Sequence, residues 1–160
     1  MSLDDCKNQK LKPKYRSYHN IKIKCMKNEF WLNLPVKDIS KSQEFFIKLG
    51  FSFKTEYANA DMVHLIAGDK GLIINLFTDS TFKNIVRNEV AGADVTEVLF
   101  SIGAESRQEV DEWATKAEDA GGEVFAKPAE SQGWLYGCAF VDLDGHRWNV
   151  LYMDMSKMPK

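Results

Sequence analysis

Two asparagines in this sequence stand inside apolar stretches, where polar side chains need a partner. Asn75 follows Ile74 in GLIINLF, and Asn149 stands in RWNVLYM. An amide offers two N–H donors and one accepting oxygen. Two interpretations stay open: the amides hydrogen-bond to each other or to backbone groups in a buried region, or they bind a polar ligand. Metal ligation is a weaker third interpretation, because a neutral amide is a poor metal ligand.

His64 is the next candidate, because it stands between Val63 and Leu65 in another apolar stretch. Its imidazole can ligate a metal, hydrogen-bond a ligand in a pocket, or have only a structural role. Cys138 is expected to pack in the core, since nothing near it in sequence supplies the base that a cysteine nucleophile needs. Three cysteines without a CxxC spacing argue against a disulfide framework and a cysteine-rich zinc site.

These candidates belong to a regular series of predicted elements in the first half of the chain. In residues 30–36, FWLNLPV, every second residue is apolar and falls on the same face, which is the period of a half-buried strand. Asp38 is a suitable N-cap for a helix that Gly50 ends. Three more strands are predicted after it, in FSFKTEY at 51–57, MVHLIAG at 62–68 and GLIINLF at 71–77.

The same order of elements returns in the second half. A strand in TEVLFSIGA is followed by a capping box, Ser106 with Glu109, and by a helix that ends at Gly121 and Gly122. Strands follow in GEVFAK, WLYGCAFVD and RWNVLYM. The turn DLDGH, residues 142–146, joins the last two as a hairpin, and its Asp144, Gly145 and His146 are expected only to build that turn.

The repeated order indicates a duplicated strand-helix-strand-strand-strand unit. Asp38 and Ser106 are separated by nearly the same number of residues as Asn75 and Asn149. We therefore predict an α+β fold of two βαβββ modules that form a cupped mixed sheet with helices on the convex face. The predicted parts are a basic arm at 1–28, a first module at 29–78, a linker at 79–94 with room for a short helix, a second module at 95–154 and a tail at 155–160.

The strand alternation also predicts which side chains face away from the helices. Each helix covers the face that carries the aliphatic residues, so the other face collects polar groups from strands of both modules. A concave surface with a few convergent polar groups is the usual place for a ligand. The residues predicted on it are Trp31, Asn33, His64, Asn75, Glu97 or Ser101, Arg147 and Asn149.

Charge and hydropathy limit the classes of function. Residues 1–28 carry eight Lys and Arg against two Asp, but they contain no recognition motif. A solvated arm, or one docked on the acidic remainder of the chain, is favoured over a nucleic-acid adaptor, which is ranked last. No apolar run is long enough to span a bilayer, and the first residues lack the apolar segment of a signal peptide. We expect a cytoplasmic protein with no nucleic-acid or membrane partner.

Two segments resemble a known superfamily. NLPVKDISKSQEFFIKLGF and YGCAFVDLDGHRWNVLYMD are similar to the corresponding motifs of the vicinal oxygen chelate superfamily, over about residues 29–154. That superfamily includes glyoxalase I, bleomycin resistance proteins, fosfomycin resistance enzymes and extradiol dioxygenases. The resemblance implies paired βαβββ modules, a dimer, and in catalytic members one divalent metal on the concave face.

At most one type of metal ligand found in those members is reproduced here. The resemblance places them at Trp31 and at Leu99 or Glu97 in the first strands, and at Asn75 and Asn149 in the last strands. Amides in place of carboxylates remove the negative charge that holds a divalent cation. We therefore expect no catalytic metal, and no cofactor, although a divalent metal stays open.

The predicted function is binding of a small polar or aromatic molecule in the concave pocket, by a homodimer. The alternative is a metal-dependent lyase or isomerase of the lactoylglutathione lyase type, or an extradiol dioxygenase-like enzyme, with His64 and Glu97 among its ligands. In the predicted binding site, Trp31, Phe77, Trp134 and Tyr136 supply stacking surface, and Asn33, His64, Asn75, Glu97 and Asn149 supply polar contacts.

Overall fold

The computed structural model describes residues 30–158 except 69–70, 93–94 and 97. The predicted basic arm and the candidate ligand Glu97 therefore lie outside the described residues. No helix within the described part is long and apolar enough to cross a membrane.

The first module is β1 (Trp31–Val36), α2 (Ile39–Lys48), β2 (Ser52–Asn59), β3 (Met62–Ala67) and β4 (Leu72–Thr78). Its strands form a four-stranded sheet, sheet A, in the order β1-β4-β3-β2. β1 runs parallel to β4, and the other neighbours are antiparallel. A parallel first and last strand require a crossover connection, and α2 provides part of it.

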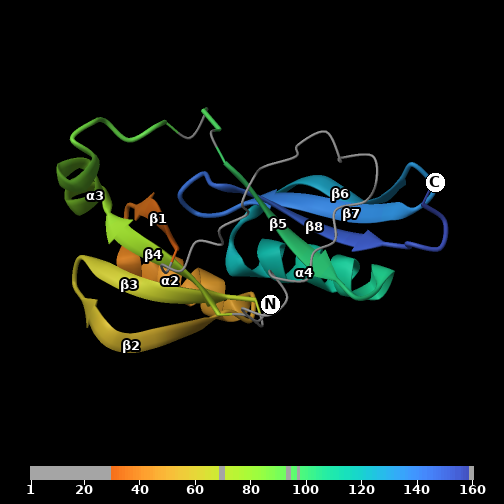
Figure 1. Cartoon of the computed structure of the whole chain (residues 1–160), viewed down its shortest axis with the longest axis horizontal. Helices are drawn as coiled ribbons and strands as arrows, with labels where there is room; N and C mark the ends of the chain where they lie inside the picture. The colour runs from red at the N-terminus through yellow and green to blue at the C-terminus, as the bar shows by residue number, and fades with distance from the viewer. Residues whose placement is uncertain (1–29, 69–70, 93–94, 97, 159–160) are drawn as a thin grey trace, which may run out of the picture. The chain divides into compact units, whose positions relative to one another are not determined.

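The second module repeats this topology. It consists of β5 (Leu99–Ala104), α4 (Arg107–Ala120), β6 (Glu123–Ser131), β7 (Leu135–Val141) and β8 (Arg147–Met153). Its strands form sheet B in the order β5-β8-β7-β6, again with a parallel first and last strand. Figure 1 shows the two sheets with α2 against sheet A and α4 against sheet B. The predicted α+β fold of two βαβββ modules is confirmed.

The helix ends are fixed by the residues that the sequence indicated. The Asp38 carboxylate accepts the Lys41 N–H at 3.0 Å, and the Ser106 hydroxyl accepts the Glu109 N–H at 3.1 Å. Each cap satisfies a backbone donor that has no partner inside its helix. After α4, Gly121 takes a left-handed conformation with φ of 99°, which costs glycine little.

Side chains from both modules share one hydrophobic core. Phe46 of α2 packs edge-on against Trp148 of β8 with ring centroids 5.5 Å apart, and Phe51 contacts both Trp148 and Trp113. Polar contacts join the modules as well, since the Asp144 carboxylate accepts the Lys37 N–H at 2.8 Å and the Ser42 hydroxyl at 2.7 Å. The faces of both sheets that carry these buried aromatic and aliphatic residues therefore pack into the same interior.

The segment after β4 contains a further helix, α3 (Asp79–Val86). It ends where Arg87 adopts a left-handed conformation with φ of 55°. The short helix falls inside the segment that the sequence indicated as a linker.

Candidate functional site

A row of polar side chains crosses sheet A on the face away from α2. Asn33 of β1 pairs in register with Asn75 of β4, which pairs with His64 of β3, and His64 pairs with Lys54 of β2. Successive residues of a strand point to opposite faces, so these side chains share the face opposite the buried aliphatic residues. We call Asn33, Asn75 and His64 the amide–imidazole row.

Hydrogen bonds connect the three side chains of the row and determine which nitrogen of His64 carries a proton. The Asn75 amide nitrogen donates to Asn33 Oδ1 at 2.7 Å, so the Asn75 oxygen is the acceptor toward His64. His64 Nδ1 lies 2.6 Å from that oxygen and therefore carries a proton. In the neutral imidazole, Nε2 is then a hydrogen-bond acceptor. It is buried and has no partner within the described part of the chain.

The corresponding row of sheet B is different. Asn149 pairs in register with Ser101 of β5 and with Ala139 of β7, and Ala139 pairs with Ala126 of β6. The Asn149 oxygen is buried and has no hydrogen-bond partner among the described residues. Asn75 therefore bonds to Asn33 and His64 and not to Asn149. Mutual pairing of the two asparagines was one form of the first interpretation; bonding to backbone groups was the other.

Two of the predicted aromatic residues share the face of the amide–imidazole row. Trp31 stands two residues before Asn33 on β1 and is 54% exposed, and Phe77 stands two residues after Asn75 on β4 and is half-buried. Trp134 lies in the turn between β6 and β7, where its carbonyl accepts the Asp154 N–H at 2.8 Å. The structure therefore brings together Trp31, Phe77 and the row, but not Trp134.

Tyr136 requires a correction, because its side chain lies on the face of sheet B that α4 covers. Its hydroxyl donates to Asp111 of α4 at 2.8 Å, and the Arg107 guanidinium lies 4.9 Å from its ring centroid. Tyr136 has the same strand parity as Cys138, whose thiol contacts the Val110 carbonyl in the core. That parity is visible in the sequence and could have placed Tyr136 correctly.

Burial of Cys138 also determines its chemistry. Desolvation raises the pKa of the thiol to about 11, with the Val150 backbone opposing that shift and the Asp111 charge adding to it. A thiol of this kind stays protonated and unreactive near neutral pH. The packing role expected for Cys138 agrees with this environment.

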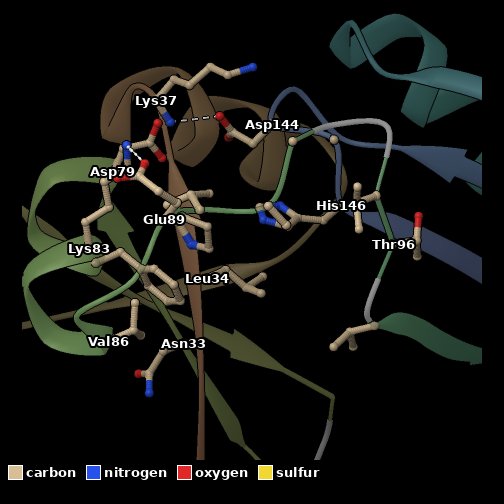
Figure 2. Close-up of a pocket in the computed structure, with 18 of the residues that line it drawn as sticks. Asn33, Leu34, Lys37, Asp79, Lys83, Val86, Glu89, Thr96, Asp144 and His146 are labelled. Atoms are coloured by element: carbon tan, nitrogen blue, oxygen red, sulfur yellow. Dashed lines mark hydrogen bonds and ion pairs between the residues drawn. The ribbon is translucent and has the colours of Figure 1, made fainter.

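Sequence reasoning missed a cavity of about 600 Å³ beside the amide–imidazole row. It lies between the end of β1, α3, the segment before β5 and the β7–β8 turn (Figure 2). Of the predicted site residues that the structure describes, Asn33 and Arg147 line it, whereas Asn75, His64 and Asn149 do not. His146 lines it as well, although the sequence indicated only a role in the turn. The signal that was available is the Asp142 to His146 spacing inside DLDGH.

We call the sheet faces away from α2 and α4 the open faces. The described residues on these two faces do not form a donor set that fits a divalent metal. The amide–imidazole row supplies one imidazole nitrogen and neutral amides, and the cationic Lys54 extends it. Sheet B contributes Asn149, with Ser101 beside it. Divalent cations in proteins are held by several imidazole or carboxylate ligands. Across the described residues, no three His, Cys, Asp or Glu side chains gather where they could hold a metal ion.

Comparisons with known proteins agree with this architecture. The family model described as "Glyoxalase/Bleomycin resistance protein/Dioxygenase superfamily" matches residues 30–150. A solved structure of hypothetical protein SA1046 from S. aureus is 34% identical, covers 83% of this chain and 99% of its own, and superposes with a TM-score of 0.73. No match was found among curated proteins.

More distant structures share the fold. Lactoylglutathione lyase from Agrobacterium tumefaciens is 18% identical over 80% of this chain and 95% of its own, with a TM-score of 0.58. The fosfomycin resistance protein FosX from Listeria monocytogenes, in complex with Mn(II) and sulfate, is 17% identical over 83% of this chain and 95% of its own, with a TM-score of 0.61. The match of the family model over most of the chain and the S. aureus relative together show that this protein belongs to the glyoxalase/bleomycin resistance protein/dioxygenase superfamily.

Proposed function

We propose that this protein binds a small polar or aromatic molecule on the open faces of its sheets without using a catalytic metal. The observation that supports this proposal is the pair of buried acceptor atoms, His64 Nε2 and Asn149 Oδ1, that lack partners within the described residues. A buried polar group without a partner costs about 1–3 kcal/mol. A ligand that brings N–H or O–H donors to these atoms removes that cost.

The surroundings of His64 favour a flat ligand. Trp31 and Phe77 share its face of the sheet and stand on either side of the row along β1 and β4. Aromatic side chains supply a large apolar contact area, while the row fixes orientation through hydrogen bonds. An aromatic molecule with an N–H donor satisfies both features.

The proposal includes pairing of two copies of the chain. Trp31 and Leu99 occupy corresponding first positions of β1 and β5, both of them edge strands, and both are more than half exposed. Large apolar side chains on sheet edges favour burial against a partner. Light scattering coupled to size-exclusion chromatography tests this point: a monomer at micromolar concentration contradicts the dimer but leaves ligand binding open to its own test.

A second candidate function is metal-dependent catalysis of the lactoylglutathione lyase or dioxygenase type. One observation favours it: His64 donates from Nδ1 to an oxygen and keeps Nε2 available, as metal-binding histidines do. The shortage of charged ligands opposes it. Metal analysis after purification without chelator separates the two candidates, because stoichiometric metal that His64→Ala and Asn149→Ala abolish would establish the second and end the first.

Binding is tested with a matched pair of probes, benzamide and N,N-dimethylbenzamide, on protein with labelled histidines. We expect benzamide to shift the His64 imidazole resonances in a saturable way and to bind about tenfold more tightly than the dimethyl form, since one hydrogen bond to a buried acceptor is lost. His64→Leu should remove the difference. Lys48→Gln, on the exposed surface of α2, is the control that keeps it. Equal affinity for the two probes contradicts the proposal.

A further inference from the structure

His146 lines the cavity beside α3 and is held in place by a buried carboxylate. Its Nδ1 lies 2.9 Å from Asp142 Oδ2, and the Asp142 side chain is only 1% exposed. The other Asp142 oxygen accepts the backbone N–H groups of Asp144, Gly145 and His146 at 2.9–3.0 Å, and Oδ2 also accepts the Trp148 indole N–H at 3.1 Å. Asp142 is therefore fully engaged and cannot turn away from the imidazole.

This bracing determines which nitrogen faces the cavity. A carboxylate accepts only, so Nδ1 of His146 carries a proton and Nε2 of the neutral ring is an acceptor. Nε2 makes no hydrogen bond with the described residues and is not buried. Figure 2 shows the imidazole extending from its turn into the space that the labelled side chains surround. The arrangement is that of a carboxylate-oriented proton acceptor.

The other charged groups around the cavity balance one another. Lys83 pairs with Glu89 at 2.7 Å, and Asp144 is engaged by the Lys37 backbone and Ser42. The Arg147 guanidinium donates to Thr96 and lies over the ring of Phe125. Among the described lining residues, the cationic Lys37, Lys83 and Arg147 equal the acidic Asp79, Glu89 and Asp144 in number. These described residues therefore provide no excess charge that would select an anion or a cation.

The rest of the described wall combines polar residues, Asn33, Asn88 and Thr96, with a larger apolar part. The apolar part includes Leu34 and Pro35 of β1, Phe82 and Val86 of α3, Val95, Val98 and Phe100. A cavity of about 600 Å³ falls in the range of small-molecule sites, which runs from roughly 300 to 1,000 Å³. The cavity size, its apolar residues and the acceptor His146 Nε2 together describe a complementary ligand: an apolar ring with one neutral O–H group.

We propose that this cavity is a second binding site, which meets the amide–imidazole row only at Asn33 and takes a small aromatic hydroxyl compound whose O–H donates to His146 Nε2. The ring of the ligand lies against the apolar residues of α3 and β1. The site makes no use of His64, Asn75 or Asn149, none of which lines the cavity.

The probe is 4-methylphenol, compared with 4-methylanisole, in which the hydroxyl hydrogen is replaced by methyl. Histidine-labelled full-length protein is titrated with each while the His146 imidazole resonances are followed. We expect saturable shifts of His146 with 4-methylphenol and about tenfold weaker binding of 4-methylanisole. Absence of a saturable shift at His146, or equal affinity for the two compounds, overturns the proposal.

Two variants test the two halves of the site. In His146→Asn the amide can keep the hydrogen bond to Asp142 but nothing replaces Nε2, so 4-methylphenol should lose its advantage over 4-methylanisole. Val86→Trp fills the apolar wall without touching His146 and should abolish binding of both compounds. Ile85→Trp is its matched control, because Ile85 is the exposed neighbour on α3 and does not line the cavity. If Val86→Trp binds as well as Ile85→Trp, the cavity is not the site, even where His146→Asn fails to fold.

The pH dependence separates a hydroxyl ligand from an acid. The charged groups around His146 within the described residues are Asp142 and Asp144 of its own turn, Asp79, Lys83 and Glu89 from α3 and the following segment, Lys37 after β1 and Arg147 of β8. Protonated His146 cannot accept a hydrogen bond, so binding of 4-methylphenol should weaken as pH falls through the His146 titration. 4-Methylbenzoate serves as the acidic comparison compound. If the protein binds 4-methylbenzoate tightly at low pH and does not bind 4-methylphenol at high pH, the assigned ligand class is wrong.

Discussion

Sheet A and sheet B place different kinds of residue at corresponding positions of the same register. On the core side, the sheet A row is Leu32, Ile74 and Leu65, whereas the sheet B row is Phe100, Trp148 and Phe140. On the open side, sheet A has Asn33, Asn75 and His64, whereas sheet B has Ser101, Asn149 and Ala139.

The difference shows how two copies of one unit can divide two tasks. Sheet B contributes large aromatic side chains to the core, where Trp148 stacks on Phe100 with ring centroids 4.5 Å apart and lies parallel to Phe140. Sheet A has smaller core residues but a hydrogen-bonded polar row on its open face. We infer that the second module contributes more to the stability of the shared core and the first module more to recognition.

Truncation of the central core residue of each sheet should produce the largest effects. Trp148 is 2% exposed, contacts aromatic rings of both modules and donates to Asp142, so Trp148→Ala should cost about 4–5 kcal/mol of unfolding free energy. Ile74→Ala, at the corresponding position of sheet A, should cost about 3 kcal/mol. Urea unfolding followed by circular dichroism measures both.

Met153→Ala is the control for this comparison, because Met153 lies on the same strand as Trp148 but is 46% exposed. It should change stability by less than about 0.5 kcal/mol. If Ile74→Ala proves as damaging as Trp148→Ala, the inferred division of the core between the modules is wrong.

The two asparagines give the next largest effect. Asn75 is 8% exposed, and Asn75→Ala leaves His64 Nδ1 and Asn33 Oδ1 without their partner, which should cost about 1–2 kcal/mol. Asn149→Ala removes an oxygen that has no partner in the described part of the chain, so it should be neutral or slightly stabilising. The difference between the two midpoints of denaturation tests the contrast between the rows. Equal destabilisation would show that Asn149 is also satisfied in the folded protein.

The sequence predicted the elements well because local rules determine them. The alternation of polar and apolar residues placed Asn33, His64 and Asn75 on the face of their strands opposite the aliphatic residues. The N-caps Asp38 and Ser106 act as expected. The sequence could not show which of these side chains contact one another. Whether Asn75 meets His64, Asn149 or a ligand depends on the order and register of the strands, which are set by contacts between distant residues.

The cavity beside α3 was beyond sequence reasoning for the same reason. Its walls come from β1, α3, the segment before β5 and the β7–β8 turn, and no local pattern places these side by side. Within DLDGH, turn chemistry explained Gly145, whose φ is 103°, but it did not show that Asp142 also orients His146 toward a cavity. One residue can thus serve a turn and a site, and a turn motif hides the second role.

The smallest predicted effect concerns the β7–β8 turn, in which Asp142 holds His146. In the first module, the register places Ala67 of β3 at the position that corresponds to Asp142, so that position has no carboxylate. Burial opposes protonation of His146, but the hydrogen bond and charge of Asp142, with Asp144 and Asp79, raise its pKa above the ordinary value of 6.5. A group whose pKa is raised in the folded state contributes stability that is fully present below its unfolded pKa and is lost as pH rises through the folded pKa. Unfolding free energies of the protein and of His146→Asn at about pH 6 and pH 8.5, which bracket the ordinary histidine range, measure this loss. The protein should lose more stability across that interval than the variant, by less than a core truncation costs, and a parallel decline in both would assign the pH dependence to groups outside the β7–β8 turn.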